Sequence, residues 1–179
     1  DSESIKNRFN VYLDNIQYDA KFIFSEVGYM LEPSEIGCAY GLEQLKKLGT
    51  FTKRRDEVTQ RHLDFFGKYS HFFEVPKMNE NANSSWFAFP LIVKEKAPFT
   101  RTDLQIFLEE RNIQTRVIFT GNIIRQPAFK GIEKKISKDG YPVADRVMAR
   151  GFLLGNHHGL TEEMIEHVHE SVEIFIKKY

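Results

Sequence analysis

The sequence predicts an α+β fold, in which a long helical arm leads to a small sheet with helices packed on one side. Two patterns predict it. Apolar residues recur at helical spacing between residues 34 and 69, and short strand-like apolar runs alternate with helical segments after residue 70. The chain has 179 residues, of which 41% are hydrophobic and 13% aromatic, so it is long enough to bury one globular core.

The first 33 residues are predicted to be a connecting region. Their strand-like runs, FNVYL and KFIF, end where Gly28 and Pro33 break the periodicity. Ser34 can then cap a helix for which Gly49 is a natural end, and a second helix follows over residues 52–69. The apolar positions of the two helices are Ile36, Ala39, Tyr40, Leu42, Leu45 and Leu48, and then Val58, His62, Phe65 and Tyr69.

The strands of the predicted sheet begin after the helical arm. Residues 71–75 and 85–93 are typical of strands, and the second run is apolar on both faces, which favours a central position, whereas Pro90 favours an edge or a bulge. Thr100 and Asp103 form a capping-box pattern at the start of a helix. A strand over residues 114–119 then completes a strand–helix–strand unit.

The last part of the chain contains one loop and three further elements. Residues 130–142 are polar and rich in turn residues, which predicts a surface loop. A short helix over residues 144–149 and the strand GFLLG follow. Thr161 caps the final helix, whose predicted buried stripe is Ile165, Val168, Val172 and Phe175.

Composition argues against several classes of partner and location. Lys plus Arg and Asp plus Glu number 25 each, so no net charge attracts nucleic acid or an anionic membrane. The single cysteine, Cys38, excludes an intrachain disulfide, favours a reducing, cytoplasmic location, and is expected to pack within its helix. No apolar run reaches the roughly 18–20 residues that span a bilayer. The first residue is Asp, which agrees with a fragment but also with processing.

The histidines do not predict a metal site. His157 and His158 are adjacent, and His167 and His169 point about 200° apart around a helix. The two histidines of each pair therefore cannot bind the same metal ion. The sequence also lacks a nucleophile elbow, a glycine-rich phosphate loop and a dinucleotide fingerprint. We therefore assign neither a metal nor a catalytic residue from these patterns.

A segment at the end of the predicted strand over residues 114–119 carries polar and cationic residues. The packing of an apolar core does not account for them. Arg116 and Arg125 could form bidentate hydrogen bonds with a phosphate or carboxylate. Asn122, beside the flexible Gly121, could approach sugar hydroxyls, and Gln126 completes the group. The alternative is a surface turn in which Arg116 pairs with a nearby carboxylate.

Several motifs, in the same order, resemble the DegT/DnrJ/EryC1/StrS family of pyridoxal-phosphate-dependent nucleotide-sugar aminotransferases and 3-dehydratases. The segment from residue 28 to residue 45 resembles the Gly-Tyr-Asn stretch of that family and the helix that follows it, and residues 115–129 resemble its 3-dehydratase branch. The other matching motifs are Arg54-Arg55, Asp145-Arg146-Val147-Met148 and Gly159-Leu160-Thr161-Glu162-Glu163-Met164.

The resemblance implies the C-terminal small domain of a fold-type-I enzyme, with a mainly antiparallel sheet. Residues 1–33 would be a connector from a large cofactor domain, 34–70 the helical arm and 71–179 the small domain. The family acts on NDP-4-keto-6-deoxyhexoses in surface-polysaccharide biosynthesis, such as lipopolysaccharide O-antigen, and forms homodimers. Its catalytic lysine or histidine lies upstream of the first matching motif, so we assign no catalytic residue and expect this chain to bind little cofactor and to be inactive alone.

The resemblance also implies residue roles. Arg116, Gly121, Asn122, Arg125 and Gln126 would bind the substrate.

Tyr29 and Met30 would lie at the cofactor phosphate of the neighbouring subunit. The family has Asn at the Met30 position, and methionine cannot donate a hydrogen bond, so this cross-subunit contact is in doubt. Residues 1–27 contain no cysteine, which fits a cluster-free 3-dehydratase better than an iron–sulfur one. Dehydration is favoured over transamination, and a stand-alone, non-catalytic nucleotide-sugar-binding or dimerisation module is the alternative.

Overall fold

The computed structural model describes residues 3, 7, 10–13, 16–20, 31, 33–82, 84–129 and 131–179. The chain forms two compact units, residues 1–43 and 44–179. The domain boundaries expected after residues 33 and 70 remain predictions. In the first unit, β1 (Val11–Leu13) and β2 (Ile16–Tyr18) form an antiparallel pair. The predicted KFIF strand lies outside the described residues.

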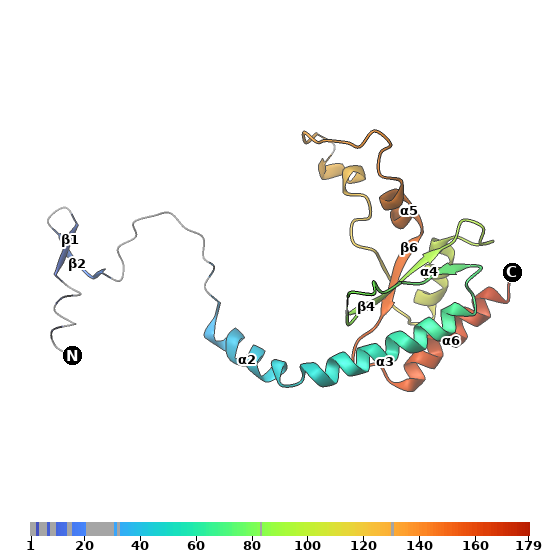
Figure 1. The fold of residues 1–179 in the computed structure, drawn as a ribbon, viewed down its shortest axis with the longest axis horizontal. Helices are drawn as coiled ribbons and strands as arrows, with labels where there is room; N and C mark the ends of the chain where they lie inside the picture. Colours follow the sequence, from blue (N-terminus) through green and yellow to red (C-terminus); the bar gives the residue numbers. More distant parts are fainter. Residues whose placement is uncertain are drawn as a thin grey trace. The chain divides into compact units, whose positions relative to one another are not determined.

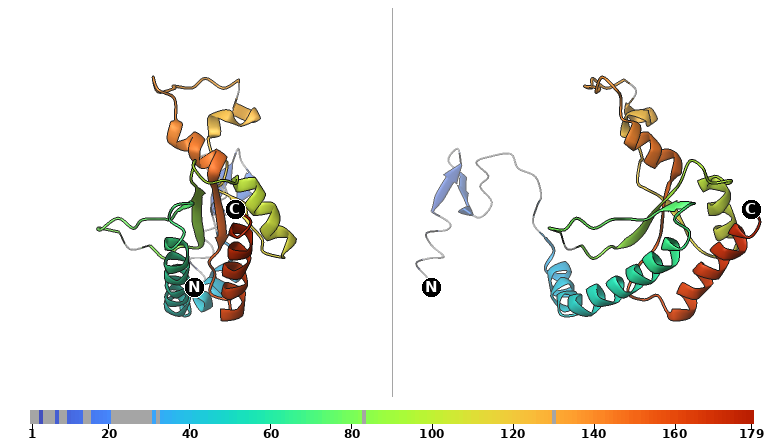
Figure 2. Two further views of the ribbon diagram at one scale, coloured as in Figure 1. Left: turned by 90° about the vertical axis from the view of Figure 1, so that its right-hand side faces the viewer. Right: turned by 45° about the vertical axis from the view of Figure 1, so that its right-hand side comes forward.

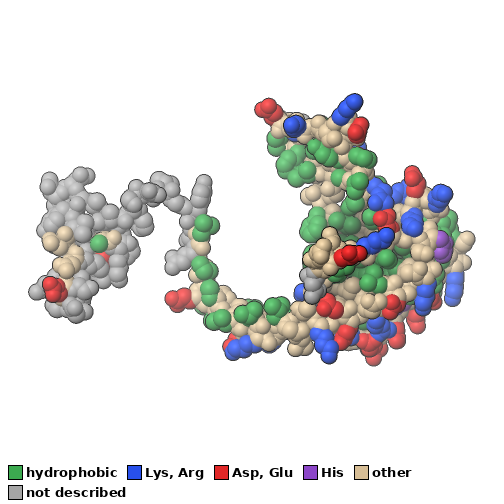
Figure 3. Space-filling view, in the orientation of Figure 1, with side chains coloured by type: hydrophobic (Ala, Val, Ile, Leu, Met, Phe, Trp, Pro, Cys, Tyr) green, Lys and Arg blue, Asp and Glu red, His purple; other side chains and the backbone are tan. Residues whose placement is uncertain are grey.

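Helix α2 (Glu35–Leu45) begins as predicted, because the Ser34 hydroxyl accepts a hydrogen bond from the Gly37 backbone at 3.2 Å. None of its residues is buried by the described part of the chain. The expectation that Cys38 packs within the helix is therefore wrong, since its side chain is exposed. Figure 3 shows apolar side chains along this helix, and they come from Ile36, Tyr40, Leu42 and Leu45.

Helix α3 (Leu48–Gly67) begins before the position that the sequence predicted. Gly49 lies in its first turn and does not end the preceding helix. The physical reason is that glycine ends helices by taking a left-handed conformation, and only Gly121 and Gly140 have positive φ among the described glycines. Its buried residues are Val58, Thr59, His62, Phe65 and Phe66.

A four-stranded antiparallel sheet organises the second unit. It consists of β3 (Phe73–Glu74), β4 (Ala88–Val93), β5 (Arg116–Val117) and β6 (Gly151–Gly155), in the order β3-β4-β6-β5. Because β4 and β5 are both antiparallel to β6, they are parallel to each other and separated by it. The predicted strand–helix–strand unit is thus present, with a later strand inserted between its two strands (Figure 1).

Strand β4 is central despite Pro90. This residue pairs with Leu153 of β6, and on the other side β3 pairs only with Val93 and Ile92. Pro90 therefore lies beyond the end of β3, where its missing N–H costs no ladder hydrogen bond. Of the two positions that the sequence left open, the central one is observed, and the short neighbouring strand explains why proline is tolerated.

Helices cover one face of this sheet, which confirms the predicted α+β class. Figure 2 shows α3, α4 (Arg101–Glu110) and α6 (Glu162–Ile176) against the sheet. Alternate residues of β4 and their partners on β6 point into this layer, as the pairs Phe89↔Leu154 and Leu91↔Phe152 show. The helices contribute Phe65, Phe66, Leu104, Leu108, Val172 and Phe175 to the core.

The caps predicted for α4 and α6 are both present. Thr100 and Asp103 exchange the two bonds of a capping box, and the Thr161 hydroxyl accepts from the Met164 backbone at 3.3 Å. In α6 the predicted stripe is largely buried, with Ile165, Val172 and Phe175 inside and Val168 half-buried.

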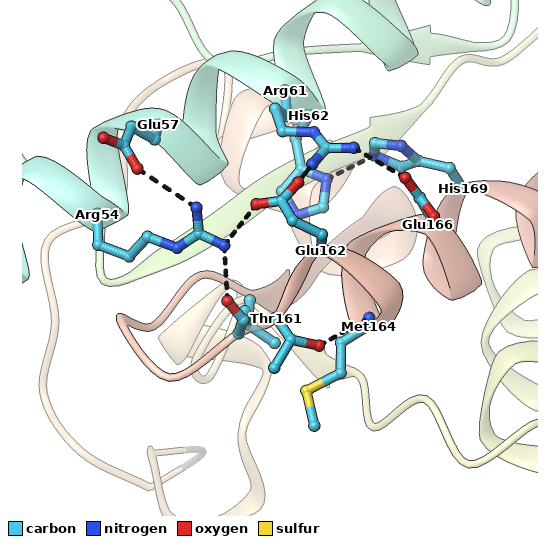
Figure 4. Close-up of polar contacts among 10 residues, drawn as sticks. Arg54, Glu57, Arg61, His62, Thr161, Glu162, Met164, Glu166 and His169 are labelled. Atoms are coloured by element: carbon cyan, nitrogen blue, oxygen red, sulfur yellow. Dashed lines mark hydrogen bonds and ion pairs between the residues drawn. The ribbon is translucent and has the colours of Figure 1, made fainter.

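Polar contacts tie α3 to α6 along their length (Figure 4). Arg54 donates to the Leu160 carbonyl and to Glu162, each at 2.8 Å, and Arg61 also pairs with Glu162. Deeper in the same contact, His62 Nδ1 and His169 Nε2 are 3.0 Å apart.

No helix among the described residues is long and apolar enough to cross a membrane.

Candidate functional site

An open cavity of about 670 Å³ lies at one end of the sheet. It forms where β4 begins, β6 ends and β5 adds the edge. The lining residues are Phe87, Ala88, Gln114, Arg116, Val117, Phe119, Leu153, Leu154, Gly155, Asn156 and His157. Such a concave, mainly apolar cavity with a few polar groups is typical of a small-molecule site.

Strand register explains which residues line it. Ala88 pairs with Gly155, and Arg116 pairs with Leu153, so these positions share the face opposite to the helices. Gly155 adds no side chain and Ala88 only a methyl group. This end of the sheet is therefore open between larger side chains.

Arg116 is the only cation among the cavity's lining residues. Its side chain is exposed and has no hydrogen-bond or ion-pair partner among the described residues, so the predicted alternative of pairing with a carboxylate is not seen. Two further lining residues, Phe87 and Phe119, expose 64% and 74% of their surface. A free guanidinium near two exposed rings suits a phosphate attached to a flat or apolar group.

His157 adds a defined hydrogen-bond donor. Its Nδ1 accepts from the Gly159 backbone at 3.1 Å, so in the neutral ring Nε2 carries the proton. The amide of Gln114 is also exposed at the cavity. Both donors suit hydroxyl or phosphate oxygens.

Asp145 of α5 (Pro142–Arg150) holds two of the predicted site residues. Its carboxylate accepts from Asn122 at 2.7 Å and from two nitrogens of Arg125, one of them at 2.7 Å. These hydrogen bonds, with that of Arg125 the largest, lower the pKa of Asp145 to about 2. The Asn122 side-chain oxygen Oδ1 in turn caps the short helix Ile123–Arg125, accepting from the Ile124 backbone N–H at 3.2 Å.

Gly121 allows this segment to pass close to α5. Its φ is +62°, and a Cβ there would lie 2.5 Å from the Met148 side chain. Gln126 fixes the same turn by donating to the Thr120 carbonyl at 2.9 Å. Gly121 and Gln126 also line a smaller cavity of about 160 Å³ that shares Val117 and Phe119 with the larger one.

The structure therefore separates the predicted site residues. Arg116 lines the large cavity, whereas Gly121, Asn122, Arg125 and Gln126 fix the segment that carries Phe119. Beyond this segment, residues 131–141 contain no helix or strand and are mostly exposed, as predicted for the loop. Tyr29 and Met30 lie outside the described residues.

Sequence reasoning missed Phe87, Phe119, Asn156 and His157 as lining residues, and Asp145 as the partner of Asn122. The available signal for the first two was an aromatic residue near one end of a strand-like run, Phe87 in residues 85–93 and Phe119 in residues 114–119. The partnership with Asp145 spans 23 residues, and no local pattern indicates it.

We expect Gly121→Ala to lower the free energy of unfolding by about 1–3 kcal/mol, because it adds both backbone strain and a clash with Met148. Gly140→Ala is the matched control, since Gly140 has φ +67° but nothing within 4 Å of a new Cβ. Urea unfolding measures both changes. Equal losses in the two variants would show that the close approach to α5 contributes nothing.

The cavity around Arg116 lacks the groups with which pyridoxal phosphate sites hold the cofactor ring. Such sites use a lysine for the Schiff base and an acidic or basic partner for the ring nitrogen. The large cavity contains neither a lysine nor a carboxylate among its lining residues. Arg116 and His157 could hold a phosphate there, but none of this cavity's lining residues is a lysine that could hold the cofactor ring covalently.

Comparisons with known proteins agree with one another. A model of the DegT/DnrJ/EryC1/StrS aminotransferase family matches residues 4–173. The dTDP-4-dehydro-2,6-dideoxy-D-glucose 3-dehydratase of Saccharopolyspora spinosa is 35% identical over 175 residues, which are 97% of this chain and 37% of that protein. The lipopolysaccharide biosynthesis protein RfbH of Salmonella typhimurium is 34% identical over 158 residues, covering 88% of this chain and 36% of that protein.

A solved structure resembles the fold. The Escherichia coli GDP-4-keto-6-deoxy-D-mannose-3-dehydratase with bound hydrated PLP aligns with a TM-score of 0.74 and 30% identity, covering 84% of this chain and 38% of that one. The chain thus spans a little over a third of the length of these relatives.

Proposed function

The chain belongs to the DegT/DnrJ/EryC1/StrS aminotransferase family, and from this premise we propose that it is the substrate-facing C-terminal domain of an enzyme acting on an NDP-4-keto-6-deoxyhexose. Dehydration at C3 is favoured over transamination, because the relative at 35% identity is named a 3-dehydratase. The pathway would be surface-polysaccharide biosynthesis, as the name of the Salmonella relative suggests. A homodimer and a cytoplasmic location remain predictions.

The observation that carries this proposal is the Arg116 guanidinium, which lines an open cavity and has no partner in the part of the chain that the structure describes. Its charge matches a diphosphate, and the exposed rings of Phe87 and Phe119 match a nucleobase or the apolar face of a sugar. We assign Arg116 direct contact with the substrate. Gly121, Asn122, Arg125 and Gln126 serve that contact by fixing the segment between β5 and α5.

The cofactor would be pyridoxal or pyridoxamine phosphate, bound mainly by residues other than those described. When bound, it would supply the electron sink for chemistry at the sugar. Tyr29 and Met30 remain the predicted residues nearest to it. The residues in the cavity would bind and orient the nucleotide sugar, and Arg116 would offset the charge of its phosphates.

Substitution of Arg116 tests the proposal. Charged hydrogen bonds contribute about 1.5–3 kcal/mol, so Arg116→Ala should weaken binding of dTDP-glucose about 10- to 100-fold by calorimetry. Arg146→Ala is the matched control, because Arg146 is an exposed arginine that pairs with Glu74 at 2.7 Å away from the cavity. Equal affinity of Arg116→Ala and the unsubstituted protein would contradict the assignment.

A further inference from the structure

We propose that Asn156 is a positioning residue for the cavity around Arg116, holding the side chains of Phe87 and His157 in place for a nucleotide sugar. This inference rests on the proposed function of that cavity. Asn156 is one of the few fully buried polar residues, with 0% of its surface exposed, although it lines an open cavity.

The orientation of the Asn156 amide is fixed by its partners. Nδ2 donates to the Trp86 carbonyl at 2.5 Å and to the Thr59 hydroxyl of α3 at 2.8 Å. A carbonyl can only accept, so Nδ2 must face Trp86. The side chain therefore connects three segments: helix α3, the residues before β4 and the end of β6.

The hydrogen bond from Asn156 links the two central strands just beyond the last backbone pair between them. The last backbone pair between β4 and β6 is Ala88↔Gly155. Beyond that pair, the Asn156 side chain continues the link by bonding the carbonyl of Trp86. Phe87 directly follows Trp86 and His157 directly follows Asn156, so one amide restrains the backbone next to two of the cavity's rings.

Asn156 Oδ1 is buried and has no hydrogen-bond partner among the described residues. A buried acceptor without a partner costs free energy, and such atoms in native proteins are normally satisfied by a ligand or an ordered water. The cost is accepted at a position where the other atom of the same amide holds Thr59 and the Trp86 backbone.

Two substitutions separate positioning from a purely structural role. Asn156→Ala removes both hydrogen bonds and should weaken binding of dTDP-glucose at least tenfold. Thr59→Ala removes the bond to α3 but leaves the bond to Trp86, so it should lower stability and keep the dissociation constant within about twofold. The single tryptophan of the chain, Trp86, reports binding by its fluorescence.

The outcomes are distinct. If both variants are less stable than the unsubstituted protein but bind dTDP-glucose equally well, Asn156 is only structural and the inference is overturned. If the unsubstituted protein itself does not bind, the proposed function fails first.

A second measurement needs no variant and covers the case in which Asn156→Ala does not fold. In the unsubstituted protein, the Asn156 side-chain amide protons should exchange slowly with solvent, and their NMR signals should shift when dTDP-glucose is added. Rapid exchange, or signals unmoved by a saturating ligand, would overturn the inference.

Discussion

Mild acid should destabilise residues 44–179, because a buried pair of histidines must remain neutral. Burial lowers the pKa of His62 to about 4. Burial, and then the positive charges of His62, Arg61 and Lys68, lower the pKa of His169 to about 3. The pair lies between α3 and α6, and the ring centroids of Phe65 and His169 are 4.0 Å apart in a stacked arrangement. Nearby, Glu162 and Glu166 form ion pairs with Arg61. The Gly155 carbonyl favours the charged form of His62, but it makes no hydrogen bond of normal geometry with Nε2.

The sign follows from the folded-state pKa values, which lie below the unfolded value of 6.5. The unfolded chain therefore binds protons first as the pH falls. The stability that depends on the neutral pair is fully present above about pH 6.5 and is lost towards pH 4 and pH 3. At roughly 1.4 kcal/mol per pKa unit, protonation of His62 alone would lower the free energy of unfolding by about 3 kcal/mol at pH 4. This is a large part of the roughly 5–15 kcal/mol that is typical of the unfolding free energy of a domain.

Urea unfolding between pH 7 and pH 4 measures this effect. His169→Gln keeps a hydrogen-bonding side chain opposite His62 but removes one titrating group, so its stability should fall less steeply with pH. His71→Gln, at an exposed histidine, is the control and should follow the unsubstituted protein. The same pH slope in all three proteins would contradict the prediction.

Truncating Phe66 should have an effect of similar size on stability at neutral pH. Its ring is fully buried, and its centroid lies 5.0 Å from that of Phe65, 5.3 Å from that of Phe73 and 5.8 Å from that of Phe89. Phe66→Ala would leave a cavity where α3 meets the sheet, at a cost of about 3–5 kcal/mol. Because α3 packs into this core, the helix and the sheet should unfold together.

Urea unfolding followed by far-ultraviolet circular dichroism and by Trp86 fluorescence tests this prediction. Both signals should report one transition at a lower urea concentration. Phe87→Ala, at an exposed ring, should change stability by less than about 0.5 kcal/mol. If helical signal disappears before Trp86 responds, α3 is a separable arm, as the predicted boundary after residue 70 would have it.

Local signals in the sequence predicted the local structure. Ser34, Thr100 and Thr161 each cap the helix that follows, because an N-cap depends on residues only three positions away. A continuous apolar run placed β4 in the sheet, and helical spacing placed the stripe of α6 in the core. The starts of helices and their buried faces can therefore be predicted from a few neighbouring residues.

Long-range partners decided what the sequence could not predict. The strand expected over residues 114–119 is only Arg116–Val117, since these are the two residues that pair with β6. Asn122 and Arg125 appeared free for substrate but bind Asp145, about 20 residues away. Cys38 appeared buried, yet no described segment buries any residue of its helix. In the site, only Arg116 was predicted and also lines the large cavity.

An NMR titration of the 179-residue chain with dTDP-glucose tests directly whether the cavity beside Arg116 binds a nucleotide sugar. We predict saturable shifts that are largest for the backbone amides of Arg116, Phe119 and His157, and unchanged signals for Glu74 and Arg146 on the control surface. Absence of saturable shifts, or shifts confined to α2 or to the control surface, would contradict the claim.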